Sequence, residues 1–299
     1  MKIALISTVR APLNELIIFV DHHLKIGVDE INLFFDDPSD EGVVYYAQHD
    51  HVNAVACTND YWLKMAGKRP ESIEGRLFTN VNAGVQMAKE NNGNWMIHID
   101  SDELLVPAGD LHKILTDSSA DALRFTLFEA ISEQQTYEHI FIPDLFKRIP
   151  NNFQLTMARL FRCSSALYNG SYFRGHVRSK MAVRISDKIK KYGNHMPEDY
   201  DASLKIVDTK EISLLHFDCV GFDDWKKKWS YRLDGTGRAD RIKGARVLQF
   251  NEYIRANSEG DEALALLYRR LHVLPKREKI ILFLLGMLKK IPVDIRCSG

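Results

Sequence analysis

The sequence lacks most of the features that restrict a chain to a specialised class of protein. It has 299 residues but only four cysteines, Cys57, Cys163, Cys219 and Cys297, and these are far apart and include no Cys-x-x-Cys pair. Such spacing predicts neither a disulfide framework nor a thiolate zinc site. A Walker loop and a dinucleotide-binding glycine fingerprint are also absent, which excludes the commonest nucleotide-binding loops.

No charge of one sign is in excess, because 40 lysines and arginines balance 40 aspartates and glutamates. This balance argues against a general nucleic-acid-binding protein, which normally carries a basic excess. The N-terminus begins directly with a strand-like apolar run and shows no basic region followed by a cleavage site, so no signal peptide is expected. We therefore expect a protein of the reducing cytoplasm.

What the sequence does contain is an alternation of strand and helix patterns. Apolar runs at residues 2–7, 31–35, 52–57 and 95–99 predict buried strands, and amphipathic patterns from Pro12 to Gly27 and from Glu74 to Glu90 predict helices between them. A short helix is expected near residues 42–48. Alternation of this kind implies an α/β fold, in which a largely parallel sheet carries helices on both faces.

The pattern changes after about residue 110. Leu123, Phe125 and Leu127 alternate as in a half-buried strand, and residues 132–191 are rich in aromatic, basic and short alternating segments. From Phe222 onward the chain is again helical in pattern. We predict one catalytic domain over residues 1–235, with a nucleotide-binding half (1–110) and an acceptor-side half (111–235), followed by a helical extension (236–299).

The most informative stretch is Trp95 to Leu105, where an apolar run ends in Asp100, Asp102 and Glu103. Carboxylates at the end of a strand lie at the edge where α/β sheets bind ligands. Two of them at positions i and i+2 can share one hard divalent cation, and that cation can hold a diphosphate. The same spacing recurs at Asp199 and Asp201, but no strand precedes that pair, so we interpret it as a solvated loop.

Three blocks of the sequence resemble glycosyltransferases of the GT-A fold, in particular family-2-like and family-92-like bacterial enzymes. The first runs from Arg10 to Asp29 and on to Asp36-Asp37, and the second is Trp95 to Leu105. The third joins Leu215-His216-Phe217 to the run from Phe222 to Arg232. The likeness covers roughly residues 1–235. It implies a Rossmann-like GT-A domain with a mixed sheet.

The resemblance implies a metal-dependent transferase that takes a sugar from a nucleotide-sugar donor, with uridine diphosphate as the expected nucleotide. Mn²⁺ or Mg²⁺ would be held by Asp100 and Asp102, with His216 as a further ligand. The nucleotide would be bound by residues that follow the strands, namely Thr8, Arg10, Asp36, Asp37, Asp100 and Ser101, and Arg76 would face the diphosphate, unless it is an exposed arginine at a helix start. The acceptor would be a surface polysaccharide such as lipopolysaccharide or capsule, or a glycolipid.

The family likeness favours inversion, which requires a base that removes the proton of the acceptor hydroxyl. Glu129, after the strand at residues 123–128, is our first choice and Asp144 our second. His176, Lys180 and His195 are the expected acceptor-binding residues. Together with Arg174, Arg178 and Arg184 they could receive an anionic acceptor.

Two other functions fit parts of the same pattern. The run from Ile97 to Asp102 is similar to the first motif of haloacid-dehalogenase-type phosphohydrolases, whose leading aspartate is a nucleophile, although that motif normally lies on the first strand. A non-catalytic domain that binds glycans or acts as a scaffold is the second alternative. The carboxylate cluster argues against it, because a scaffold has no need for buried negative charge.

The C-terminal segment Lys276–Lys290 has an apolar run flanked by basic residues at both ends. The run is too short to span a bilayer, which needs about 20 residues. It suits a helix lying in the interface of an anionic membrane. A helix that docks on the catalytic domain, or a dimer contact, fits it equally, so peripheral membrane contact remains one of two interpretations.

Overall fold

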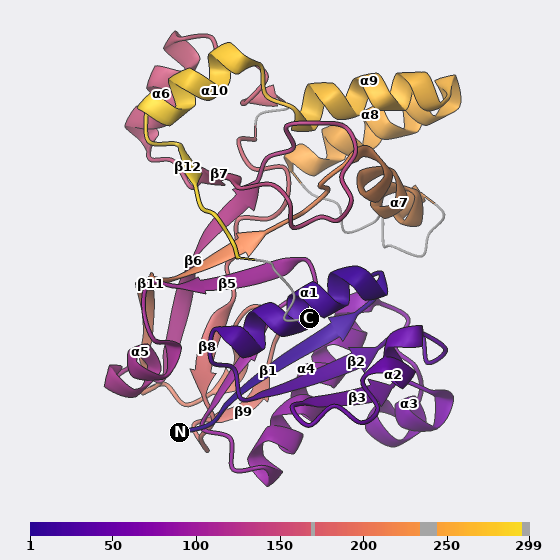
Figure 1. Ribbon diagram of the computed structural model, residues 1–299, viewed down its shortest axis with the longest axis vertical. Helices are drawn as coiled ribbons and strands as arrows, with labels where there is room; N and C mark the ends of the chain where they lie inside the picture. The colour runs from indigo at the N-terminus through magenta and orange to yellow at the C-terminus, as the bar shows by residue number, and fades with distance from the viewer. Residues whose placement is uncertain (169–170, 234–243, 295–299) are drawn as a thin grey trace. The chain divides into compact units, whose positions relative to one another are not determined.

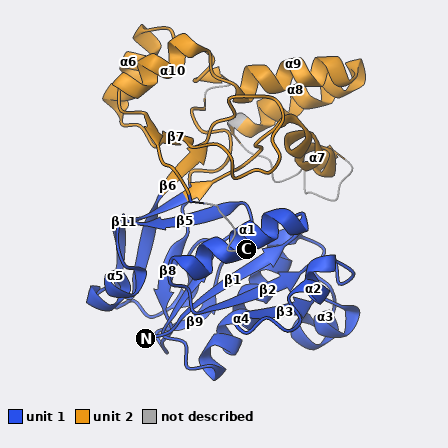
Figure 2. Cartoon of the chain, viewed as in Figure 1, with its two compact units in different colours: residues 1–126, 178–214, 294–299 blue, residues 127–177, 215–293 orange. Residues whose placement is uncertain are grey.

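The computed structural model describes residues 1–168, 171–233 and 244–294 (Figure 1). The chain forms two compact units that are interleaved in sequence (Figure 2). Unit 1 contains residues 1–126, 178–214 and 294–299, and unit 2 contains residues 127–177 and 215–293. The prediction divides the chain into contiguous segments (1–110, 111–235 and 236–299), whereas each unit combines segments that are separate in sequence. The predicted boundary at residue 235 lies outside the described residues, as does Cys297.

Unit 1 contains four parallel strands, in the order β3 (Val52–Ala56), β2 (Glu30–Phe35), β1 (Ile3–Val9) and β4 (Trp95–His98). β8 (Met181–Arg184) pairs antiparallel with β4, and the first residues of β6 (Ala122–Ala130) pair antiparallel with β8. Val9 lies opposite Phe35, and Phe35 opposite Ala56. The residues that follow these parallel strands therefore lie along one edge of the sheet.

The helices of unit 1 begin and end where the sequence provides caps. α4 (Ile73–Glu90) begins at Ser72, whose hydroxyl accepts a hydrogen bond from the Gly75 N–H. Its buried side packs on β1 so closely that a Cβ at Gly84 would lie 2.8 Å from Ile6. α1 (Leu13–Lys25) follows Pro12 and ends before Gly27, which has a φ of 100°. The remaining helices are α2 (Glu41–Tyr45), α3 (Asn59–Ala66) and α5 (Leu111–Asp117).

Three further features complete the strands of unit 1. β5 (Glu103–Pro107) follows β4 after a short turn and pairs with β11 (Ile206–His216), which also pairs with β6. β9 (Ile189–Tyr192) and β10 (Pro197–Tyr200) form a separate antiparallel pair. β6 and β11 each begin in unit 1 and end in unit 2.

In unit 2, the end of β6 pairs antiparallel with β7 (Leu145–Arg148), and β7 pairs antiparallel with β12 (Leu288–Lys290). The helices of this unit are α6 (Asn152–Leu160), α7 (Phe222–Leu233), α8 (Ala245–Glu259), α9 (Asp261–His272) and α10 (Lys276–Leu284). α7, α8 and α9 enclose an aromatic core in which Trp225 and Trp229 pack against Tyr253 and Tyr268.

The predicted α/β class, with a mixed sheet and helices around it, is confirmed. The strands and helices expected before residue 100 are all present, because the apolar residues that define their periods are buried within unit 1. The helical pattern expected after Phe222 is present as α7 to α10, with the short strand β12 added after it.

Candidate functional site

The three clustered carboxylates lie on the turn between β4 and β5, which we call the acidic turn (Asp100–Glu103). β4 is completely buried and ends at His98, and β5 begins at Glu103. Glu103 is buried, and its carboxylate accepts a hydrogen bond of 2.8 Å from the Asp100 N–H. Asp100 and Asp102 are half-buried. Glu103 therefore shapes the turn, and the two aspartates are its more exposed carboxylates.

Lys180 is the counter-ion of this turn. Its ammonium lies 3.0 Å from Asp100 Oδ2 and donates a hydrogen bond of 3.1 Å to the Asn194 carbonyl. The Lys180 side chain is 1% exposed, whereas that of Asp100 is 31% exposed. Burial alone would lower the pKa of Lys180, but the neighbouring carboxylates, Asp100 first, raise it above its usual value. A fixed positive charge thus lies beside the aspartates. The sequence predicts Lys180 as an acceptor-binding residue and gives no sign of this contact.

A cavity of about 870 Å³ lies beside the ends of β1, β2 and β3. Among the residues that line it are Arg10, Asp36 and Asp37, which the sequence predicts to contact the nucleotide, and Arg69. Asp36 Oδ1 lies 2.8 Å from Arg69 Nη2 and 2.9 Å from Arg76 Nε. The wall of the cavity therefore combines acceptors for a ribose or a base with cations for a phosphate.

Arg76 is buried, with 7% of its surface exposed, so the alternative of an exposed arginine at a helix start is wrong. Burial lowers the pKa of Arg76, and Asp36 opposes this effect. Its guanidinium also donates hydrogen bonds to the carbonyls of Pro70 and Glu71, both at 3.1 Å. Arg76 thus fixes Asp36 and the loop before α4.

Thr8 is held by a residue that the sequence analysis did not single out. Its hydroxyl accepts a hydrogen bond of 3.0 Å from Asn80 Nδ2, and Asn80 Oδ1 accepts one of 2.7 Å from the Tyr61 hydroxyl. Asn80 is completely buried. A polar residue on the apolar face of the helix at residues 74–90 was a signal that could have identified it.

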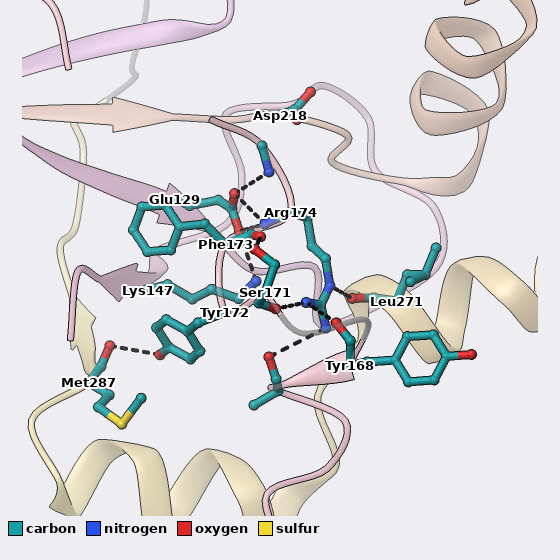
Figure 3. Close-up of polar contacts among 12 residues, drawn as sticks. Glu129, Lys147, Tyr168, Ser171, Tyr172, Phe173, Arg174, Asp218, Leu271 and Met287 are labelled. Atoms are coloured by element: carbon teal, nitrogen blue, oxygen red, sulfur yellow. Dashed lines mark hydrogen bonds and ion pairs between the residues drawn. The ribbon is translucent and has the colours of Figure 1, made fainter. Parts of the chain in front are cut away.

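Glu129, the predicted base, lies in a closed polar network of unit 2 (Figure 3). One carboxylate oxygen binds Lys147 Nζ at 2.8 Å, and both accept hydrogen bonds from the Arg174 N–H. The Gly175 N–H donates a further bond of 2.7 Å. Burial alone raises the pKa of Glu129, yet Lys147 and the backbone donors together hold it below its usual value. A buried carboxylate with these bonds is a weak base, so its environment argues against the catalytic role and assigns it a structural one.

Two of the three arginines that were expected to help bind an anionic acceptor, Arg174 and Arg184, already make contacts within the protein. Arg174 is 3% exposed and donates to the carbonyls of Leu271, Ser165, Tyr168 and Ser171 (Figure 3). The Arg184 guanidinium lies 4.4 Å from the centre of the Trp95 ring. Asp144, the second candidate base, is 37% exposed and pairs with Lys290 at 3.0 Å.

His216 and His176 lie together in unit 2, where their rings stack with 4.8 Å between centroids. A nitrogen of His216 also lies within 4.8 Å of a carboxylate oxygen of Asp218. A Cβ on Gly175 would lie 3.0 Å from Asp218 and 3.2 Å from His216, so a larger residue there would have to displace these side chains by a few tenths of an ångström. Imidazole and carboxylate are both metal ligands, and Asp218 is an addition to the sequence prediction.

The predicted residues are thus divided between the units. Of the expected metal ligands, Asp100 and Asp102 belong to unit 1 and His216 to unit 2. Of the expected acceptor residues, Lys180 and His195 belong to unit 1 and His176 to unit 2. Ser101 lies on the acidic turn between the two aspartates, half-buried.

Comparison with known structures gives likenesses at low sequence identity. TarS of S. aureus (residues 1–349) is 11% identical, with a TM-score of 0.40 and coverage of 77% of this chain and 63% of that one. A TarS structure in complex with UDP-GlcNAc has a TM-score of 0.39 at 10% identity, covering 94% of this chain and 84% of that one. HddC of Yersinia pseudotuberculosis has a TM-score of 0.36 at 12% identity, covering 76% and 97%.

Comparison of sequences is more decisive. A glycosyltransferase-like protein of Arabidopsis thaliana is 24% identical over 330 aligned positions, which cover 97% of this chain and 70% of the relative. A second one is 28% identical over 260 positions, covering 78% of this chain but only 48% of the relative. The chain thus spans about half the length of the second relative. The family model of glycosyltransferase family 92 matches residues 7–243. Because this match covers most of the sequence, the chain belongs to glycosyltransferase family 92.

Proposed function

We propose that this glycosyltransferase transfers a sugar from a uridine diphosphate-linked donor, with the help of a divalent cation, to a surface-glycan or glycolipid acceptor, with inversion. The observation that carries the proposal is the acidic turn at the end of β4, where Asp100 and Asp102 remain half-buried beside the fixed charge of Lys180. Membership of the family decides against the phosphohydrolase and scaffold alternatives.

The strand-end cavity supports a nucleotide donor. Asp36 and Asp37 offer acceptors to ribose hydroxyls or to a base N–H, and Arg10 and Arg69 offer donors to phosphate oxygens. Asp36 is held by two arginines and is therefore fixed before a ligand arrives. A site ordered in advance loses less conformational entropy on binding.

The acidic turn supports a hard divalent cation such as Mn²⁺ or Mg²⁺. Carboxylate oxygens are the ligands these ions prefer, and we propose that Asp102 supplies one, with Asp100 beside it. The bound cation would act as a Lewis acid toward the departing diphosphate. Lys180 occupies Asp100 Oδ2, so Asp100 would be the more constrained of the two ligands. The part of His216 in the metal shell stays a prediction.

The acceptor hydroxyl requires a base, and the acceptor itself requires side chains that bind it. With Glu129 enclosed, Asp144 remains the candidate base, since its ion pair with Lys290 is exposed and such a pair costs little to break. His176 and His195 remain predicted acceptor residues. A lipid-linked acceptor implies that the chain works at a membrane surface.

The decisive experiment is calorimetric titration of uridine diphosphate with and without Mn²⁺. We expect Mn²⁺-dependent binding in the wild type and its loss in Asp102→Ala. Asp199→Ala is the matched control, because Asp199 belongs to the second Asp-x-Asp sequence, on the exposed strand β10. Absence of binding in the wild type, with guanosine, cytidine and thymidine diphosphates also inert, would reject the proposed donor class.

A further inference from the structure

Two helices of unit 2, α6 and α10, expose an unusual number of large apolar side chains. On α6, Phe153 is 70% exposed and Leu160 69%, and on α10, Phe283 is 56% exposed and Leu284 81%. Phe161 and Ile280 add 42% and 53%. Residues spaced by three, four or seven share one face of a helix, so each helix has an apolar outer face. We call these six side chains the apolar surface.

The helices that carry this surface are fixed side by side in antiparallel fashion. Gln154 Nε2, at the start of α6, donates a hydrogen bond of 2.8 Å to the Leu285 carbonyl at the end of α10. At the other end, Arg277 donates one of 3.0 Å to the Phe161 carbonyl. Figures 1 and 2 show the two helices next to each other.

The inner side of α10 is anchored in unit 2. Leu282 is completely buried, and the buried carboxylate of Glu278 accepts hydrogen bonds from the N–H groups of Ser165 and Ala166 at 3.1 and 2.8 Å. The sequence was compatible with a helix docked on the protein and with a helix lying in a membrane interface. The inner side of α10 is docked within unit 2. Its outer side is exposed and can still contact a membrane.

Cations outnumber carboxylates around the apolar surface. The chain has no aspartate or glutamate from residue 145 to residue 186, and only the buried Glu278 from residue 276 to residue 290. The carboxylates of Glu133 and Asp144 already pair with Lys279 and Lys290. The exposed cations on and beside the two helices are Arg148, Arg159, Arg162, Lys276, Arg277 and Lys289. In a chain of zero net charge, this is a concentrated positive region.

We propose that the apolar surface and its basic rim form a docking site for an anionic phospholipid membrane. The apolar side chains would enter the boundary between headgroups and acyl chains, and the cations would contact the phosphates. None of the described helices is both long and apolar enough to cross a membrane. The proposal does not rest on the proposed donor, because it concerns binding in the absence of any nucleotide.

The test is co-sedimentation of the full chain with vesicles. We expect binding to vesicles of phosphatidylcholine and phosphatidylglycerol, weaker binding to phosphatidylcholine alone, and a decrease with added salt. The double variant Phe283→Ser/Leu284→Ser should bind at least about tenfold more weakly. Lys276→Gln should bind about fivefold more weakly, since each basic residue near an anionic surface contributes roughly 1 kcal/mol.

Leu266→Ser is the matched control, because Leu266 is 59% exposed on α9 in the same unit. It should bind as the wild type does. No binding of the wild type to anionic vesicles would overturn the proposal, and so would equal loss in Leu266→Ser and the double variant. Self-association of the chain that is abolished by the double variant, without vesicle binding, would assign the surface to a second copy and overturn it equally.

Discussion

Two buried lysines, one in each unit, bind a carboxylate in contrasting ways. Lys180 pairs with Asp100 in unit 1 and Lys147 with Glu129 in unit 2, at 3.0 and 2.8 Å. The Asp100 side chain is 31% exposed, whereas that of Glu129 is 3% exposed and is further bonded by the N–H groups of Arg174 and Gly175. A carboxylate near the end of a strand can therefore bind a ligand only where backbone N–H groups do not already enclose it.

The largest effect is expected where the pair is enclosed. Glu129→Gln leaves Lys147 as an uncompensated buried charge, and removal of one partner of a buried pair costs about 3–5 kcal/mol. Urea unfolding should show this loss. The exposed Asp208, which pairs with Arg124 at 2.8 Å, is the matched control, and Asp208→Asn should cost less than about 1 kcal/mol. If Glu129→Gln and Asp208→Asn lost the same unfolding free energy, the enclosed pair would be no more important for stability than the exposed one.

The same pair predicts a dependence on pH. Because the folded protein holds the pKa of Glu129 below the ordinary value of 4.5, the unfolded chain takes up the proton first as the pH falls. The stabilisation by Glu129 is therefore complete above about pH 4.5 and is lost below it. The difference in unfolding free energy between wild type and Glu129→Gln should narrow as the pH is lowered from 5 toward 3. A constant difference over that range would contradict the prediction.

At the acidic turn we expect loss of activity in place of loss of stability. Asp102→Asn keeps the shape of the side chain but removes the charge that would hold a cation, and should lower the rate of sugar transfer by roughly 10²–10³-fold, the usual scale for removal of one electrostatic contact to the transition state. Thermal unfolding should change little, since Asp102 is half-buried. Asp199→Asn should change neither quantity.

Lys180→Met tests the cation of the Lys180–Asp100 pair instead of the carboxylate. Removing a positive charge beside Asp100 and Asp102 should tighten the binding of Mn²⁺ by roughly tenfold, because like charges repel. The rate of sugar transfer should fall, because Asp100 is no longer held. Calorimetric titration of Mn²⁺ would measure the first effect. Lys188→Met is the control, because Lys188 is 42% exposed and pairs with Asp121. Unchanged Mn²⁺ affinity in Lys180→Met would show that Lys180 does not influence the cation.

The smallest effect on stability is expected at the cavity. Arg69 is 46% exposed in its pair with Asp36, so Arg69→Gln should cost less than about 1 kcal/mol in unfolding free energy. The affinity of the Arg69→Gln variant for uridine diphosphate should nevertheless fall several-fold, since an arginine that contacts a phosphate contributes a charge-assisted hydrogen bond. Lys64→Gln, on the neighbouring helix α3, should leave the affinity unchanged.

The first hundred residues could be predicted closely because their signals are local. The hydrophobic periods of β1 and α4, the capping serine at position 72 and the strand that ends before Asp100 can each be seen in a short window of sequence. The position of Asp36 after β2 follows from the parallel register of the sheet.

What could not be predicted depends on contacts between distant residues. Lys180 reaches Asp100 only because β8 pairs antiparallel with β4, and nothing in either segment specifies that pairing. Glu129 resembled a base because the strand before it was visible, whereas the loop at Arg174 and Gly175 that encloses it was not. The interleaving of the units was missed for the same reason, since β6 was expected as one local strand and β11 was not predicted at all.

The interleaved chain also has a consequence for synthesis on the ribosome. β4 can pair with β1 only after residue 98 has emerged, and its other neighbour, β8, does not begin until Met181. At the usual rate of 5–20 residues per second this strand edge would wait about 4–17 seconds for its partner. During that time a buried, apolar sheet edge is open to pairing with other chains. We expect nascent chains that stall between residues 100 and 180 to be the form of this protein most prone to aggregate.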